Sequence, residues 1–138
     1  MSDASRSVKV PVPTHYYQFD QQGIAFNMWY LAFMEQARNG FLAARGFSLE
    51  DLLSSSHDIQ LVHAEISWNA ALRYGESLDI DVELAHAGTT SFSLRHVLEV
   101  RGDTRARASV VYVIVDNATH QKAVLPDGLR RALVGEPS

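Results

Sequence analysis

The sequence predicts an α+β domain in which a curled antiparallel sheet wraps one long buried helix. Two patterns support this fold class. Residues 28–34, MWYLAFM, contain no polar stripe, so a helix formed by them must be covered on nearly every side. Residues 58–115 read as successive strands. Holding a single helix in the palm of one sheet is an economical two-layer arrangement of these elements.

The first half of the chain supplies an edge strand and then the helix. Residues 8–19 have a strand-like composition, and Pro11 and Pro13 place the start of this strand toward a sheet edge. The helix is predicted to run from about residue 28 to residue 45. It ends there because Gly46 can adopt the left-handed conformation that closes a helix.

The second half predicts four strands and a closing helix. The strands cover residues 58–68, 77–84, 91–100 and 104–116. Residues 77–84 alternate polar and apolar side chains, so this strand is expected to have one wet face. Turns at residues 88–90 and 101–103 connect the last three strands as a meander. Pro126 is predicted to begin a short closing helix.

Length, composition and charge limit the class of protein. A chain of 138 residues with 46% hydrophobic content suffices for one core and is short for two, so residues 1–138 are predicted to form a single domain. Twelve Lys and Arg against 16 Asp and Glu leave no global basic field for nucleic acid or an anionic membrane. The absence of Cys excludes disulfides, thiolate metal sites and a cysteine nucleophile. Because no signal peptide or membrane span is recognisable, the sequence predicts a cytoplasmic protein.

One motif near the predicted helix start carries a family resemblance. It reads Phe19-Asp20-x-x-Gly23-Ile24-x-Phe26-Asn27-x-x-Tyr30, followed by Phe33-x-Glu35-x-Ala37-Arg38. The motif resembles the signature of the 4-hydroxybenzoyl-CoA thioesterase family of hot-dog-fold proteins. Further landmarks follow in the order of that family: Leu72-Arg73-Tyr74-Gly75-Glu76, Thr90-Ser91, Leu125-Pro126 and Leu129-Arg130. The resemblance therefore spans the chain.

The resemblance implies a fold, an assembly and a reaction. The fold is a hot-dog: five or six antiparallel strands wrapped on one long helix. The assembly is a homodimer or homotetramer with active sites at the dimer interface. The reaction is hydrolysis of an acyl-CoA thioester, with no cofactor beyond the coenzyme A of the substrate. Asp20 takes the role of nucleophile or general base, and backbone N–H groups around Asn27 hold the carbonyl oxygen.

Two departures from the family pattern bear on the substrate. Many members have His after the glycine, whereas this chain has Ile24 there and Phe26 at the next variable place. The Gly-Ile-x-Phe version resembles the aromatic-acyl branch of the family. Met28 and Trp29 replace the small or proline residues common in that branch.

The residues themselves support this chemistry. Thioester hydrolysis needs a base or nucleophile for the carbonyl carbon and hydrogen-bond donors for the oxygen that becomes negative. A carboxylate beside a helix N-terminus supplies both. Each residue also has a purely structural alternative. Asp20 can close its loop toward Gly23 as an Asx-turn, and Asn27 can be a plain N-cap.

Substrate contacts are predicted at several further positions. Residues around the site are expected to bind the acyl group and its thioester: Gly23, Ile24, Phe26, Tyr30 and Ser91. Arginines on adjacent strands suit the phosphates of coenzyme A: Arg95, Arg105 and Arg107. The alternative for each arginine is a solvated strand face that discourages edge pairing. His96 shares a face with apolar residues and is either a proton carrier or a satisfied core or interface residue. No ligand set with metal-binding spacing appears.

Three functions remain open at this stage. The first is an acyl-CoA thioesterase. The second is a thioesterase acting on acyl carrier protein, docked through a basic surface patch. The third is a non-catalytic acyl-CoA-binding protein or assembly subunit, suggested by the absent histidine and the Met28-Trp29 pair. The acyl group and the choice between nucleophilic and general-base chemistry also remain open, because both mechanisms need the same ionised carboxylate.

Overall fold

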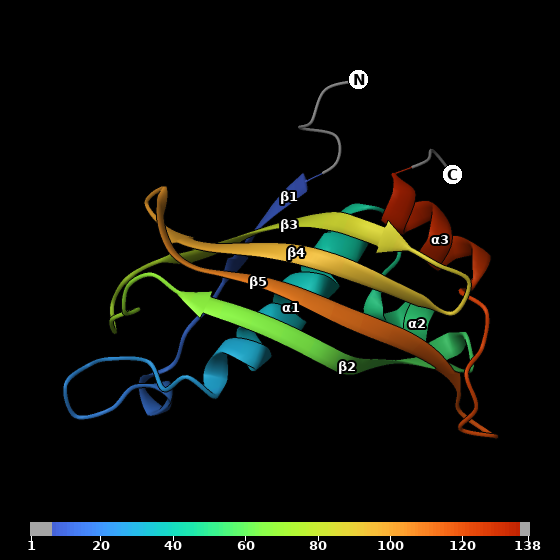
Figure 1. Cartoon of the computed structure of the whole chain (residues 1–138), viewed down its shortest axis with the longest axis horizontal. Coiled ribbons are helices and arrows are strands. Elements are labelled where there is room, and N and C mark those ends of the chain that lie inside the picture. The colour runs from blue at the N-terminus through green and yellow to red at the C-terminus, as the bar shows by residue number, and fades with distance from the viewer. Residues whose placement is uncertain (1–6, 136–138) are drawn as a thin grey trace.

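The computed structural model describes residues 7–135 as a curved sheet with helices on its concave side (Figure 1). The strands are β1 (Ser7–Val12), β2 (His57–Trp68), β3 (Leu78–Ala87), β4 (Ser91–Val100) and β5 (Asp103–Asp116). The helices are α1 (Trp29–Ala44), α2 (Leu49–Ser54) and α3 (Asp127–Val134), with a 3₁₀ helix at Tyr16–Gln18. This composition confirms the α+β class.

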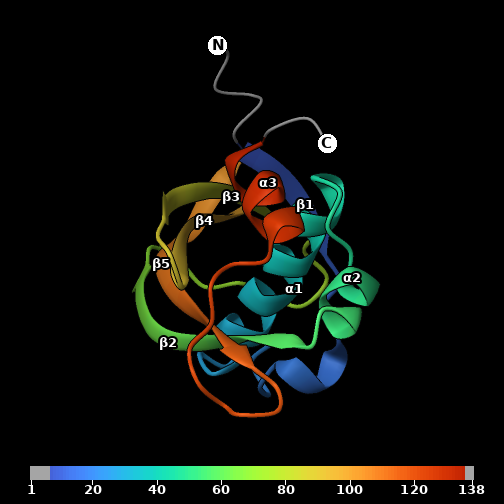
Figure 2. The ribbon, with the colours of Figure 1, turned by 90° about the vertical axis from the view of Figure 1, so that its right-hand side faces the viewer.

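The sheet has the strand order β1-β3-β4-β5-β2, and every neighbouring pair is antiparallel. Strands β3, β4 and β5 form the predicted meander. β1 and β2 precede them in the chain and occupy the two edges. Pro11 lies in β1, where its missing N–H can face away from the sheet. The end view shows the sheet curling around α1 (Figure 2).

Helix α1 spans 16 residues, one fewer at each end than predicted. It buries one side against the sheet, where Tyr30, Phe33, Met34, Ala37 and Phe41 lie. Its other side is not covered, because the sheet of one chain reaches only one side of the helix: Leu31 remains 38% exposed, and Met28, just before the helix, 72%. The expectation of burial on nearly every side is therefore wrong for the single chain.

Element boundaries differ from the prediction mainly near the N-terminus. The first strand ends at Val12 rather than Phe19. Pro13 follows directly, and the backbone N–H of His15 then donates to the Oε1 of Gln18 across the 3₁₀ turn (2.8 Å). The strand over residues 8–19 was predicted from amino-acid composition alone, and composition does not exclude such a turn. The predicted strand 77–84 begins one residue later and continues to Ala87.

Gly40 lies where α1 packs against β1, and a Cβ there would lie 2.5 Å from the Cγ1 of Val10. We expect Gly40→Ala to lower the free energy of unfolding by about 1 kcal/mol, since overpacking costs about 1–3 kcal/mol and the gain in helix propensity returns about 1 kcal/mol. Urea unfolding measures this change. Val10→Ala should lower the free energy of unfolding by less in the Gly40→Ala background than in the wild type. An equal decrease in both backgrounds would contradict the steric explanation.

Candidate active site

Asp20 lies in the segment that connects the 3₁₀ helix to α1, here called the Asp20 loop (residues 19–27). Its Oδ1 accepts hydrogen bonds from the backbone N–H of Gln22 (2.8 Å) and of Ile24 (3.0 Å). The Gly23 N–H donates to the Asp20 carbonyl (2.9 Å), and Gly23 has a φ of +76°, which favours glycine. Asp20 therefore closes its loop, as the structural alternative predicted. Within residues 7–135 its second carboxylate oxygen has no hydrogen-bond partner, so it can contact a substrate or a water.

The N-terminus of α1 follows this loop directly. The first turn is closed by hydrogen bonds from the Trp29 N–H to the Phe26 carbonyl (3.1 Å) and from the Tyr30 N–H to the Asn27 carbonyl (3.2 Å). The N–H groups of Asn27 and Met28 precede these bonds and lie at the positive end of the helix dipole. The N-cap residue is Met28 and makes no side-chain cap hydrogen bond. The N-cap alternative for Asn27 is therefore wrong.

A pocket of about 310 Å³ opens beside the helix start. It is lined by Ile24, Ala25, Asn27, Tyr30, Trp68, Asn69, Ala70 and Ala71. The rings of Tyr30 and Trp68 meet edge to face with centroids 5.8 Å apart. Burial raises the pKa of the Tyr30 phenol, so this group is neutral near pH 7. The pocket thus combines a helix N-terminus with two aromatic rings.

The structure brings together only part of the predicted set. Ile24, Asn27 and Tyr30 line the pocket, whereas Asp20 is not among the residues that line it in the single chain. Phe26 is 46% exposed. Sequence reasoning missed Trp68 and the three residues that follow it. The available signal was their place just before the Leu72–Glu76 landmark, but nothing in the sequence showed that this segment faces the Asp20 loop.

That segment, here called the wall loop (residues 69–77), is hydrogen-bonded to the Asp20 loop. The Ala25 N–H donates to the Leu72 carbonyl (2.9 Å), and the Tyr74 N–H donates to the Gly23 carbonyl (2.8 Å). The two loops are therefore joined by backbone hydrogen bonds shortly before the start of α1.

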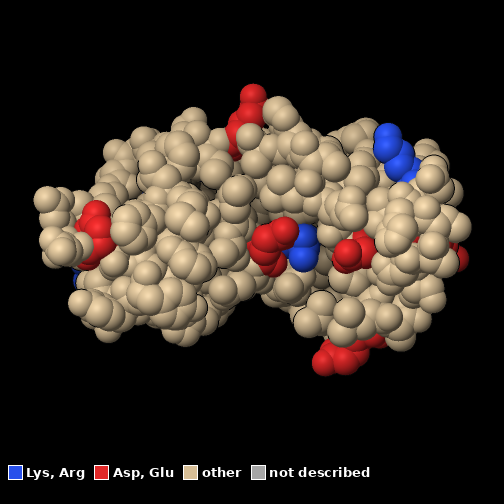
Figure 3. All heavy atoms as spheres, turned by 90° about the horizontal axis from the view of Figure 1, so that it is seen from below, with Lys and Arg blue, Asp and Glu red and all other residues tan. Residues whose placement is uncertain are grey.

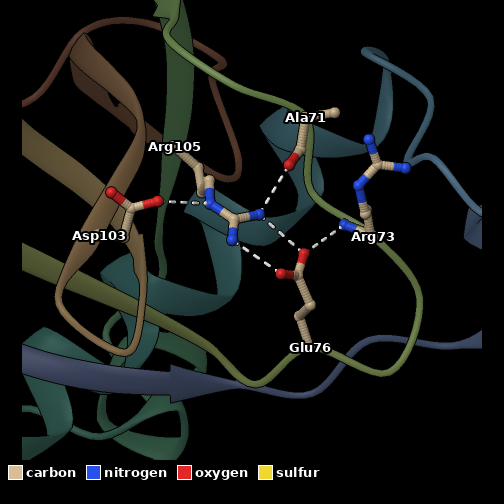
Figure 4. Close-up of polar contacts among 5 residues, drawn as sticks. All are labelled: Ala71, Arg73, Glu76, Asp103 and Arg105. Carbon is tan, nitrogen blue, oxygen red and sulfur yellow. Dashed lines mark hydrogen bonds and ion pairs between the residues drawn. The ribbon is translucent and has the colours of Figure 1, made fainter.

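Arg105 on β5 is anchored to the wall loop (Figure 4). Its guanidinium donates to both carboxylate oxygens of Glu76 (2.7 Å each), to the Ala71 carbonyl (2.7 Å) and to Asp103 Oδ2 (3.1 Å). The hydrogen bonds from Arg105 lower the pKa of Glu76 to about 2, so the pair is charged at neutral pH. Four of the five guanidinium N–H groups are thus occupied by the protein, which leaves little capacity for a phosphate.

The other predicted phosphate ligands lie elsewhere. Arg95 and Arg107 line a groove of about 630 Å³ on the sheet face opposite α1, together with carboxylates: Glu65, Asp81 and Glu83. Arg95 Nε donates to Glu83 Oε1 (2.8 Å). Ser91 pairs with Val113, eight positions along β5 from Arg105. The predicted arginine cluster is therefore divided in the single chain, and Ser91 is remote from the pocket.

Two further findings concern residues 7–135. None of their helices combines the length and the apolarity needed to cross a membrane. They contain no group of three or more His, Asp or Glu residues arranged to hold a metal ion.

Comparison with known proteins identifies relatives along most of the chain. A family model described as the Thioesterase-like superfamily matches residues 17–133. A 1,4-dihydroxy-2-naphthoyl-CoA hydrolase of Synechococcus elongatus is 25% identical over 113 residues, which are 80% of this chain and 83% of that protein. The match establishes the superfamily, while the narrower 4-hydroxybenzoyl-CoA thioesterase family stays a prediction.

Solved structures share the fold. A 1,4-dihydroxy-2-naphthoyl-CoA thioesterase from Synechocystis superposes with a TM-score of 0.79 at 21% identity, covering 94% of this chain and 95% of that one. A thioesterase from Thermus thermophilus, solved with coenzyme A and Zn, gives a TM-score of 0.76 at 24% identity, covering 95% and 96%. These likenesses confirm a hot-dog architecture for this sheet and helix.

Proposed function

Because this chain belongs to the thioesterase-like superfamily and is a thioester hydrolase, we propose that it cleaves acyl-CoA to a carboxylic acid and free coenzyme A. The observation that carries the proposal is the Asp20 loop. It leaves one carboxylate oxygen without a protein partner and leads directly into the N-terminus of α1, beside a pocket of about 310 Å³.

In the proposed mechanism Asp20 and the helix start act on the same carbonyl group. Asp20 either attacks the thioester carbon, forming an anhydride that water then hydrolyses, or takes a proton from an attacking water. The N–H groups of Asn27 and Met28 stabilise the oxygen that becomes negative. Donors of this kind contribute about 2.7–4 kcal/mol each to transition-state stabilisation. The coenzyme A thiolate leaves and takes up a proton.

The pocket supports an aromatic acyl group. Its volume suits one or two rings, and the ring of Trp68, which is 46% exposed, offers an aromatic surface for stacking. The relative from Synechococcus is named for a naphthoyl thioester, and the Thermus structure is titled as a complex with coenzyme A. Both names agree with the proposed substrate class.

The proposed active unit is a homodimer or a homotetramer built from dimers. Asp20 does not line the pocket of its own chain, and Ser91 lies far along β4, which supports a site that a second copy completes. β2 is an edge strand of 12 residues whose outer edge has no partner strand within residues 7–135. Viewed from the side on which β2 lies, the surface is mostly free of charged groups (Figure 3). Pairing of two β2 edges would cover this surface.

The test is hydrolysis of a panel of aromatic, short-chain and long-chain acyl-CoAs, with the release of free thiol as the measurement. We expect turnover, with the highest kcat/KM for aromatic acyl groups. The same acyl groups carried on acyl carrier protein form the second arm. Faster hydrolysis of the carrier-protein thioesters would contradict the CoA assignment, and tight acyl-CoA binding without hydrolysis in either arm would indicate a binding protein.

A further inference from the structure

The ion pair of Arg105 and Glu76 is a connection between β5 and the wall loop that the proposed chemistry does not use. We propose that this pair is a positioning unit for the active site. It holds the wall loop against the Asp20 loop, and thereby fixes the Asp20 carboxylate and the amides at the start of α1. The inference rests on the proposed thioesterase function and deepens it.

Arg105 is hydrogen-bonded to both ends of the wall loop. Its backbone carbonyl accepts hydrogen bonds from the N–H groups of Asn69 (2.8 Å) and Ala70 (3.1 Å). Its guanidinium reaches Ala71 and, with two parallel bonds, Glu76. Because a guanidinium and a carboxylate match in this fork geometry, the pair sets orientation as well as distance. The two side chains are only 13% and 17% exposed, so solvent screens them weakly.

Glu76 also binds the middle of the wall loop. Its Oε1 also accepts from the backbone N–H of Arg73 (2.7 Å), as Figure 4 shows. Arg73 forms an isolated antiparallel bridge with Ile24. The N–H of Ile24 donates to Asp20 Oδ1, and its carbonyl accepts from the Asp20 N–H (2.9 Å). A continuous series of contacts thus joins the ion pair to the Asp20 carboxylate.

This placement predicts an effect on turnover more than on binding. No atom of the pair needs to touch the substrate, because the pair acts through the two loops. A shift of about 1 Å in a reacting group can cost on the order of 100-fold in rate. Loosening the wall loop should therefore lower kcat, while KM changes by less than about twofold.

The experiment compares Glu76→Gln with Glu99→Gln. Glu99 is a matched control, because its side chain is 15% exposed and pairs with Lys9 (2.8 Å), and within residues 7–135 it makes no hydrogen bond or ion pair with the wall loop. We expect kcat to fall about 10- to 100-fold in Glu76→Gln and to stay at the wild-type value in Glu99→Gln. Arg105→Lys serves as a second variant. It keeps the charge but cannot form two parallel bonds, so it should retain an intermediate kcat.

Amide hydrogen exchange supplies a readout independent of activity. The N–H groups of Ala25 and Tyr74 bridge the two loops. Their exchange should accelerate about tenfold in Glu76→Gln and remain unchanged in Glu99→Gln. Wild-type kcat or unchanged exchange in both Glu76→Gln and Arg105→Lys would overturn the inference. Absence of wild-type hydrolysis, with accelerated exchange in the variants, would instead refute the proposed function and leave the loop contact as a purely structural one.

Discussion

Asp20→Asn should lower the turnover of acyl-CoA by about 10²–10⁴-fold while leaving the protein folded. Asparagine keeps the side-chain oxygen that accepts from the Gln22 and Ile24 amides, so the loop can remain closed. It has no negative charge, and therefore can neither attack the thioester carbon nor take a proton from water. Free-thiol release measures the loss, and thermal unfolding of the same samples measures whether the fold is retained.

Asp116→Asn is the matched control for this variant. Asp116 Oδ1 also accepts from two backbone N–H groups, those of Ala118 (2.8 Å) and Thr119 (3.0 Å), in the turn after β5. Loss of turnover in Asp20→Asn but not in Asp116→Asn would assign the effect to chemistry rather than to loop closure. Full activity of Asp20→Asn would contradict the catalytic role of Asp20.

The second large effect is expected on stability and concerns His96. This residue is 1% exposed in the core, and within residues 7–135 neither ring nitrogen has a hydrogen-bond partner. The reading of His96 as a satisfied core residue is therefore wrong. Burial, and secondarily the charge of Arg38, lower the pKa of His96 from its usual 6.5 to about 4.

The sign of the pH effect follows from this shift. Between pH 6.5 and pH 4 the unfolded chain binds a proton at His96 that the folded chain does not bind. Stability due to this group is complete above pH 6.5 and falls as the pH drops toward 4. At pH 5 the loss should be about 2 kcal/mol, since one pKa unit corresponds to about 1.4 kcal/mol. Glu76 does not interfere at pH 5, because its carboxylate is still mostly ionised in both states.

Urea unfolding at pH 7 and pH 5 tests this prediction. His96→Leu should remove about 2 kcal/mol of the difference between the two pH values, because leucine does not titrate. His86→Leu is the control for the loss of a histidine outside the core, since His86 is exposed on β3. An identical pH dependence in His96→Leu and the wild type would show that His96 does not carry the effect.

Local signals explain which parts of the fold were predictable. The alternation over residues 77–84 predicted a strand with one buried face, and Leu78, Ile80 and Val82 are buried. Gly46 predicted the end of the helix; α1 ends at Ala44, and Gly46 has a φ of +94°. Backbone conformation and side-chain period are set by neighbours in sequence. The turn at Asp20 could be predicted for the same reason, because the hydrogen bonds that its side chain accepts come from residues two and four positions away.

The sequence by itself determined the α+β class, the helix, the meander and the proximity of Asp20 to a helix start. Pro11 and Pro13 also indicated that the first strand lies at an edge. Only the tertiary structure decided that β2 is the other edge, that Trp68 lines the pocket and that Arg105 holds Glu76. Arg105 and Glu76 are 29 residues apart, and their contact depends on how the wall loop crosses the end of β5. The spacing of hydrophobic residues and the residue types of turns act on neighbours in sequence. The partner of a charged side chain, in contrast, depends on which distant segments pack against each other and are buried from water.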